Sequence, residues 1–136
     1  MQIYRSNFKK TPGSSYKEIY PYTLRVYKNV RSRSKRQPYV RSRYFSKNKV
    51  FLDLFWQHIH EKNHRDRVRR LQYFEAGLDV VRNSNYKPNQ KKNPNNTSEQ
   101  LYRFTGSTKD NQIFYVQIKE NTRTNRKGLI SIFPAN

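Results

Sequence analysis

The spacing of apolar residues changes once along the chain, from a helical period between residues 50 and 82 to strict alternation between residues 101 and 133. From Val50 to Ile59 apolar residues recur every three or four positions, which predicts a first helix over 49–62. A second series from Val68 to Val81 predicts another helix that ends near Asn83. Both helices are amphipathic, so each requires a partner for its apolar face.

Alternation predicts strands over 101–105, 113–120 and 129–133, separated by turn-forming segments. Residues 85–98, with two prolines and five asparagines, predict a loop before them. We therefore expect an α+β fold, with two helices packed on a curved antiparallel meander. One set of strand residues should face the helices: Tyr102, Phe104, Phe114, Val116, Ile118, Ile130 and Ile132. The other set should face away: Arg103, Tyr115, Gln117, Lys119 and Ser131.

The chain carries 29 Lys and Arg against 9 Asp and Glu, a formal net charge of +20 on 136 residues. A field of this size attracts polyanions, and binding to a phosphate chain releases condensed counterions. The excess is greatest in residues 1–48, which hold 13 basic residues and one acid. We interpret residues 1–48 as a basic, partly disordered arm, with a possible strand over 22–30, and residues 49–136 as the folded domain.

Within the arm, basic residues alternate with Tyr39, Tyr44 and Phe45. Such a segment is either a solvated tail or a nucleic-acid arm that orders on binding, and the two interpretations are compatible. The candidate nucleic-acid-binding residues are Arg31, Arg33, Lys35, Arg36, Arg41 and Arg43 in the arm, Arg67 and Arg70 on the second helix, and Gln117 on the sheet.

The composition excludes several classes of protein. No cysteine is present, so disulfide frameworks, thiolate zinc sites and cysteine nucleophiles are excluded. No stretch approaches the roughly 18 apolar residues that span a bilayer, and the first ten residues lack the apolar region of a secretory signal. We expect a cytoplasmic protein that uses no membrane, cofactor or metal.

The outward face of the predicted sheet could support chemistry on RNA. Cleavage without a metal needs a base for the 2′-hydroxyl, cations for the phosphorane and an acid for the leaving oxygen. Arg103 and Lys119 would supply the cations, and Ser131 a hydroxyl. His58, on the helix stripe that meets the sheet, is the candidate acid or base. The alternatives are that His58 only packs and that the cations only hold RNA.

The segment from His60 to His64 has the HExxH spacing of zinc-dependent proteases. Lys62 lies inside the motif, and Asn63 and His64 are typical of a break between two helices. A break would place the two histidines on different helices, so we do not interpret the motif as a zinc site.

The segments LYRFTGSTKDNQIFYVQIKE and KGLISIFP, after two helices, resemble the superfamily of barnase, EndoU, colicin ribonucleases and RelE (BECR), in particular its phage- and mobile-element-associated branches. The resemblance covers residues 50–134. It implies a metal-independent endoribonuclease, often a toxin that an acidic antitoxin or inhibitor holds. Position by position, it supports Arg103, Lys119 and Ser131 as site residues. The late strands lack the histidine of barnase-like members, which favours the Arg- and Lys-rich style of RelE-like toxins.

Three functions remain open at this point. The first is a ribonuclease toxin that acts on RNA, with or without the ribosome. The second is a non-catalytic protein that binds RNA or DNA. The third is an interaction protein whose charge matches an acidic partner.

Overall fold

The computed structural model describes residues 2–34 and 36–135 and has an α+β fold. Its helices are α1 (Tyr16–Ser32), α2 (Asp53–Glu61), α3 (His64–Leu71) and α4 (Phe74–Asn83). Its strands are β1 (Ile3–Arg5), β2 (Tyr39–Ser42), β3 (Asn48–Phe51), β4 (Asn89–Asn93), β5 (Asn96–Ser107), β6 (Ile113–Asn121) and β7 (Lys127–Pro134).

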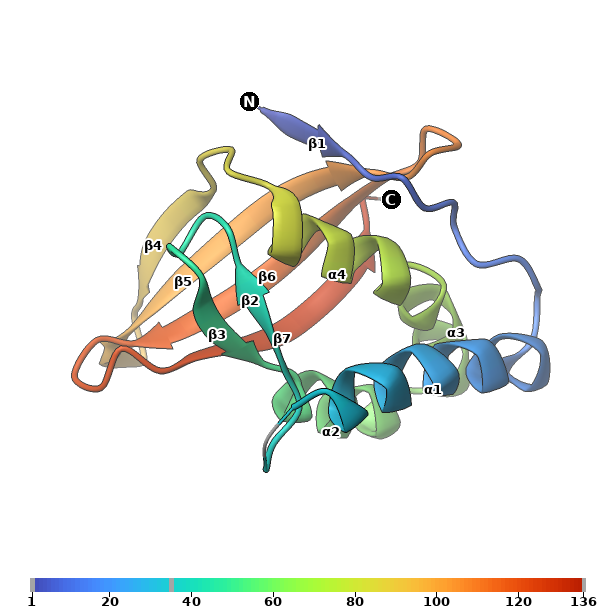
Figure 1. Ribbon diagram of the computed structural model, residues 1–136, viewed down its shortest axis with the longest axis horizontal. Coiled ribbons are helices and arrows are strands. Elements are labelled where there is room, and N and C mark those ends of the chain that lie inside the picture. The colour runs from blue at the N-terminus through green and yellow to red at the C-terminus, as the bar shows by residue number, and fades with distance from the viewer. Residues whose placement is uncertain (1, 35, 136) are drawn as a thin grey trace.

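All the strands join one mixed sheet, with the order β1-β5-β6-β7-β3-β2 and with β4 paired to β5 (Figure 1). The antiparallel strands β5, β6 and β7 form the predicted meander. However, β1 runs parallel to β5 and β3 runs parallel to β7, and these pairings extend the sheet on both sides. The α+β class is therefore confirmed, but the predicted arrangement of two helices packed on an antiparallel meander was wrong.

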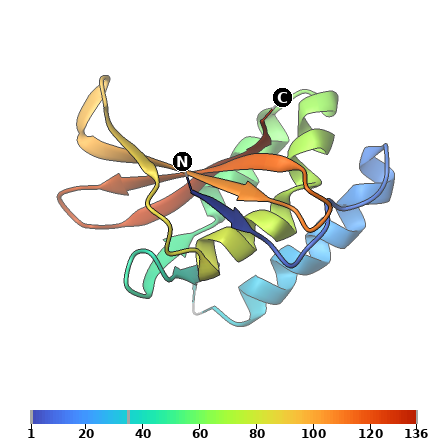
Figure 2. The ribbon, with the colours of Figure 1, turned by 90° about the horizontal axis from the view of Figure 1, so that it is seen from above.

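The sheet curls around α4, and the helices lie on its inner side (Figures 1 and 2). Glycines permit this close packing, because a Cβ on Gly77 of α4 would lie 2.5 Å from Cδ1 of Ile132 on β7. On β5, a Cβ on Gly106 would lie 2.8 Å from Cγ2 of Val80. The core therefore lies between the helices and the inner side of the sheet, and no helix of the described residues covers the outer side of the meander (Figures 1 and 2).

The N-terminal third contains β1, α1 and β2, and so differs from the basic, partly disordered arm that the sequence predicts. Residues 22–30, a possible strand by sequence, lie within α1, whose buried residues Ile19, Thr23, Tyr27 and Val30 recur at helical spacing. Tyr27 stacks on Trp56 of α2 at 4.0 Å between ring centroids. The buried face of α1 is hard to recognise in the sequence because Thr23, one of its four buried residues, is polar. The proposed division after residue 48 falls inside β3.

A buried carboxylate holds the first residues in place. Asp79 of α4 is 3% exposed and accepts hydrogen bonds from the Ser6 hydroxyl at 2.7 Å and the Tyr4 hydroxyl at 3.2 Å. It also accepts from the backbone N–H of Asn7 at 3.0 Å and the Asn83 amide at 2.6 Å. The segment around β1 is thus fixed to α4 as well as to β5.

Two element boundaries in the helical region differ from prediction. Val50 and Phe51 belong to β3, so the first predicted helix begins only at Asp53. The second predicted helix is two helices, separated at Gln72, whose side-chain amide donates to the carbonyl of Gly13 at 2.9 Å. At the break Gln72 binds the N-terminal segment, a long-range contact that periodicity does not encode.

Residues 85–98 are not a simple loop. Asn89–Asn93 form β4, which pairs with β5 in a hairpin and widens the sheet. Strand pairing here rests on backbone hydrogen bonds, which asparagine and lysine can make although their side chains disfavour strands. No helix in the described residues is long and apolar enough to cross a membrane.

Candidate nucleic-acid interface on the open sheet face

Strand alternation divides β5, β6 and β7 into a helix-facing side and an outer side. Tyr102, Phe104, Phe114, Val116 and Ile118 are buried on the helix-facing side, as predicted. The outer side, here called the open face, is formed by Arg103, Tyr115, Gln117, Lys119, Ser131 and Phe133.

A β-bulge corrects one residue of the predicted pattern. The register of β6 and β7 shifts after Gln117, which pairs with Ser131, whereas Ile118 pairs with Leu129. The bulge leaves Ile130 as an extra residue, so Leu129 is fully buried in place of Ile130. Ile130 instead lines a hollow on the open face.

One cross-strand row carries polar groups through the middle of the open face. Arg103 lies directly opposite Gln117, which lies opposite Ser131, and Asn89 of β4 extends the row on the other side of Arg103. The Arg103 guanidinium stacks over the rings of Tyr115, at 5.1 Å, and Phe133, at 5.8 Å. Aromatic faces attract cations, so these rings hold Arg103 while its N–H groups remain available.

A second guanidinium, that of Arg70 on α3, contacts Ser131 and Phe133 of the open face. Nη1 of Arg70 donates to the Ser131 hydroxyl oxygen at 2.6 Å, and the guanidinium lies 5.4 Å from the centroid of Phe133. The Arg70 side chain can reach Ser131 because, in the described residues, β3 pairs with β7 only at Lys127 and Gly128. The rest of the β7 edge next to β3 is therefore open to α3. Burial lowers the pKa of Arg70, but an arginine stays charged at neutral pH.

Two arginines from distant elements therefore contact the same aromatic ring, that of Phe133. Sequence reasoning had placed Arg103 in the site but had assigned Arg70 only to the general basic surface. The spacing of the second helix contains no signal for this role, since only the open edge of β7 gives Arg70 access to Ser131.

Lys119 is less available to bind a phosphate than the sequence predicts, because it is already paired with a carboxylate. Its ammonium forms an ion pair with Glu99 at 3.2 Å, with side-chain exposures of 34% for Lys119 and 19% for Glu99. The Asn93 amide donates to Glu99 at 2.8 Å, and this hydrogen bond, followed by the lysine, holds the pKa of Glu99 below its usual value. Glu99 is therefore ionised at neutral pH and offsets the charge of Lys119.

His58 lies in α2 and is half-buried. Leu54, one helical turn earlier on the same side of α2, would be 3.5 Å from a Cβ on Gly128 of β7. His58 is thus on the side of α2 that faces β7, as predicted, but among the described residues no hydrogen bond links it to Arg103, Arg70 or Ser131.

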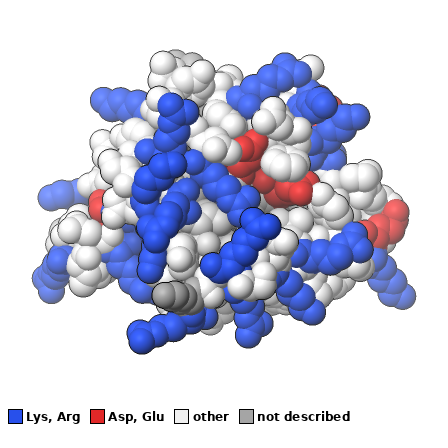
Figure 3. Space-filling model, in the orientation of Figure 1, with Lys and Arg blue, Asp and Glu red and all other residues white. Residues whose placement is uncertain are grey.

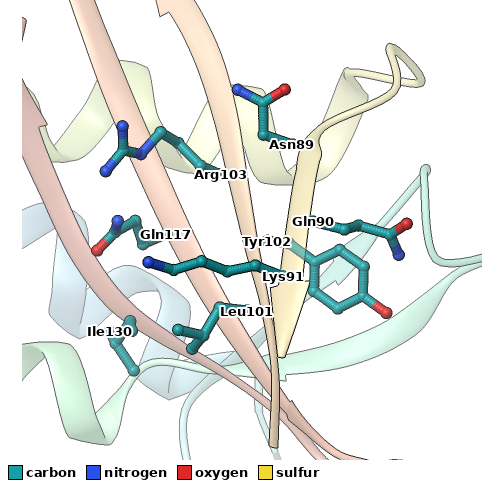
Figure 4. A pocket seen from close by; sticks show the side chains of 8 residues that line it. All are labelled: Asn89, Gln90, Lys91, Leu101, Tyr102, Arg103, Gln117 and Ile130. Atoms are coloured by element: carbon teal, nitrogen blue, oxygen red, sulfur yellow. The ribbon is translucent and has the colours of Figure 1, made fainter. Parts of the chain in front are cut away.

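A hollow of about 200 Å³ lies beside the polar row, between β4 and β7 (Figure 4). Lys91, Arg103 and Gln117 line it from three strands, together with the apolar side chains of Leu101 and Ile130. Sequence reasoning missed Lys91 because it assigned this segment to a loop. A hollow lined by apolar side chains and by the cations Lys91 and Arg103 suits a nucleobase with its phosphate.

The remaining basic residues that were predicted to bind nucleic acid differ in exposure and in contacts. Arg31, Arg33, Arg36, Arg41 and Arg43 are exposed, and Lys35 lies outside the described residues. Arg67 is structural, because its guanidinium donates to the carbonyls of Ile59, His60 and Lys62 at the end of α2. That contact satisfies carbonyls that the helix leaves without partners.

The HExxH segment is divided between two helices. His60 lies in the last turn of α2 and His64 begins α3, with the chain extended at Lys62 and Asn63 between them. The Asn63 side chain accepts a hydrogen bond from the backbone N–H of Asp66 and caps α3. Within the described part of the chain, no cluster of three potential metal ligands is found.

No family model matches this chain, and comparisons with curated proteins and with solved structures find no match.

Proposed function

We propose that the open face binds RNA and cleaves it without a metal ion, by attack of a 2′-hydroxyl on the adjacent phosphorus. The observation that carries the proposal is that the Arg70 and Arg103 guanidiniums both contact the Phe133 ring, while Arg70 also donates to the Ser131 hydroxyl. Two fixed guanidiniums match the charge that develops on a pentacoordinate phosphorane. The proposal agrees with the BECR resemblance, which itself stays a prediction.

In the proposed step the 2′-oxygen forms a bond to phosphorus while the bond from phosphorus to the 5′-oxygen breaks. The products are a 2′,3′-cyclic phosphate and a free 5′-hydroxyl. The 2′-hydroxyl proton leaves to a base, and the 5′-oxygen gains a proton from an acid. His58, on the side of α2 that faces β7, is our candidate for one of these transfers. Arg70 and Arg103 stabilise the phosphorane, and Ser131 positions Arg70.

Cleavage is tested with purified protein, labelled RNA and EDTA, with and without ribosomes. We expect cyclic-phosphate ends, and a loss of about 100-fold or more in rate for Arg70→Ala or Arg103→Ala, as for removal of one stabilising donor in other enzymes. Lys17→Ala, an exposed cation on α1, is the matched control. RNA that stays intact under all these conditions would eliminate the nuclease.

A non-catalytic RNA-binding protein is the second candidate, and the Lys119–Glu99 ion pair favours it. One of the two cations expected for catalysis is already neutralised there. If RNA binds, depends on Arg70 and Arg103, and is never cut, this second function holds. An acidic antitoxin or inhibitor that covers the same cations stays a prediction in either case.

A further inference from the structure

A second cationic surface lies on the β2–β3 hairpin, at the far side of the sheet from β4. It consists of Tyr39, Arg41, Lys49 and Phe51 together with Arg126 from the turn between β6 and β7, and it is called the hairpin patch here. All of these residues except Tyr39 line an open depression of about 740 Å³, in which every other lining residue is a lysine or an uncharged polar residue. Figure 3 shows Lys and Arg side chains gathered over this hairpin.

The hairpin patch and the open face are parts of one face of one sheet. Tyr39 pairs with Phe51, Phe51 with Gly128, and Gly128 with Lys119. The row continues from Lys119 through Leu101 to Lys91. Directly paired residues point to the same side of a sheet, so this row connects the two surfaces along the outer side of the curled sheet.

The charges in the hairpin patch have no acidic partner among the described residues. Arg41 and Lys49 lie directly opposite each other, an arrangement that destabilises a strand pair. Both lie over the Tyr39 ring, at 5.5 Å and 4.7 Å, while Arg126 lies 3.9 Å from the Phe51 centroid. Rings attract these cations but leave their charge uncompensated, and an anion bound between Arg41 and Lys49 would relieve the repulsion.

We propose that the hairpin patch is a second subsite for the phosphate backbone of a single-stranded RNA that occupies the open face. This inference rests on the proposed function, because the same strand must engage both surfaces. From β4 to β2 the row crosses six strands, and at about 4.8 Å per step this is a path of roughly 24 Å. A stacked strand with about 3.4 Å per phosphate needs roughly seven nucleotides for that path.

The test compares 4-nucleotide and 12-nucleotide single strands of 2′-O-methyl RNA, which lack the attacking hydroxyl and stay intact. Fluorescence anisotropy with the full chain gives Kd and its salt dependence. We expect the longer strand to bind at least tenfold more tightly than the shorter one. The double variant Arg41→Ala/Lys49→Ala should lose most of that gain, and the slope of log Kd against log salt should fall by about 1.4, as for two phosphate contacts on a single strand.

The matched control is Lys17→Ala/Lys28→Ala, which removes the same charge from exposed positions on α1. It should keep the difference between the two lengths. Lys49→Glu separates binding from folding, because it places opposite charges across the hairpin. It should raise the midpoint of thermal unfolding while it weakens binding of the longer strand.

The inference is overturned if both lengths bind equally, or if the hairpin double variant behaves like the control. In those cases the proposed function survives, provided that the short strand still binds and depends on Arg70 and Arg103. Absence of binding to either strand would overturn both. A duplex that binds more tightly than the single strand would also overturn the inference, since the path is assigned to a flexible strand.

Discussion

At the residue scale, the open face is defined by which cations are already paired. Arg103 and Arg70 have aromatic and hydroxyl partners, whereas Lys119 has a carboxylate. An aromatic ring under a guanidinium does not neutralise its charge, so the guanidinium attracts a phosphate at full strength. Glu99 lies beside Lys119 and weakens the attraction of that lysine for a phosphate. Among the cations of the open face, Arg103 and Arg70 therefore keep their charge for a ligand, whereas Lys119 shares its charge with Glu99.

Glu99→Gln should strengthen RNA binding. The change removes a negative charge next to the proposed RNA path and frees Lys119, while an amide can still accept a hydrogen bond from Asn93. One like-charge contact of about 1 kcal/mol corresponds to roughly a fivefold gain in affinity. Anisotropy with the 12-nucleotide strand measures it, and Glu61→Gln at an exposed position on α2 is the control. An unchanged Kd would show that the RNA avoids this pair.

Tyr22 should make stability depend on pH in the alkaline range. Its hydroxyl donates to Glu75 at 2.7 Å, and this hydrogen bond, with burial, raises the pKa of Tyr22 to about 12. The folded state thus favours the protonated phenol, so its contribution is complete below pH 10 and is lost as the pH rises through about 12.

Tyr22→Phe should therefore lower the free energy of unfolding by about 1 kcal/mol at pH 8 and flatten its decline above pH 10. Urea unfolding at several pH values measures both effects. Tyr86→Phe, at an exposed position, should leave the pH profile as it is in the wild type. If the Tyr22→Phe curve parallels the wild-type curve, the assignment to Tyr22 is wrong.

At the element scale, α4 sets the curvature of the sheet. It contacts β2, β5 and β6, and its glycine lets Ile132 of β7 approach the helix backbone. The curl in turn places the outer side of β2 and β3 in the same face as Arg103. The distance between α4 and the meander therefore affects both stability and the shape of the proposed RNA path.

Gly77→Ala tests this packing. Alanine favours a helix over glycine by about 1 kcal/mol, but here its Cβ would meet three side-chain atoms of Ile132 at 2.5–3.1 Å. We expect overpacking to dominate, with a net loss of about 1–2 kcal/mol in the free energy of unfolding. Gly128→Ala, whose Cβ would make ordinary contact at 3.5 Å, is the control in the same urea titration. A stabilised Gly77→Ala variant would mean that α4 is free to move outward.

At the scale of the whole molecule, the N-terminal third belongs to the fold. Three segments of it complete the structure: β1 on one edge of the sheet, the β2–β3 hairpin on the other, and α1 on the helical side. Much of the excess positive charge in this part of the sequence, which suggested a mobile arm, therefore lies on helices and strands of the fold. Fixed cations bind a strand without the entropy cost of ordering a tail.

Removal of residues 1–7 should destabilise the protein by about 3 kcal/mol, because it leaves the buried carboxylate of Asp79 with fewer donors. Thermal unfolding by circular dichroism measures the change. Asp79→Asn in the truncated chain should restore part of the loss, since a neutral amide is less costly to bury than a charge. A truncated chain as stable as the full one would restore the interpretation of this segment as a dispensable arm.

The sequence by itself determined the α+β class, the three antiparallel strands and the cationic side of the meander. Helical and strand periods are local properties, so Phe104 and Phe114 could be assigned to the core and Arg103 and Gln117 to the outer side without coordinates. The alternation failed only at Ile130, where a bulge inserts one residue and shifts the register.

Only the tertiary structure decided which side chains work together. Arg70 meets Ser131, Lys119 meets Glu99, and the β2–β3 hairpin joins β7 because strands and helices distant in the sequence pack against one another. The same packing makes a helix of residues 16–32, whose charge and mixed polarity favour a tail, because Thr23 and Tyr27 are buried on its inner side. Long-range burial outweighs local composition there, and it also decides where the free positive charge lies.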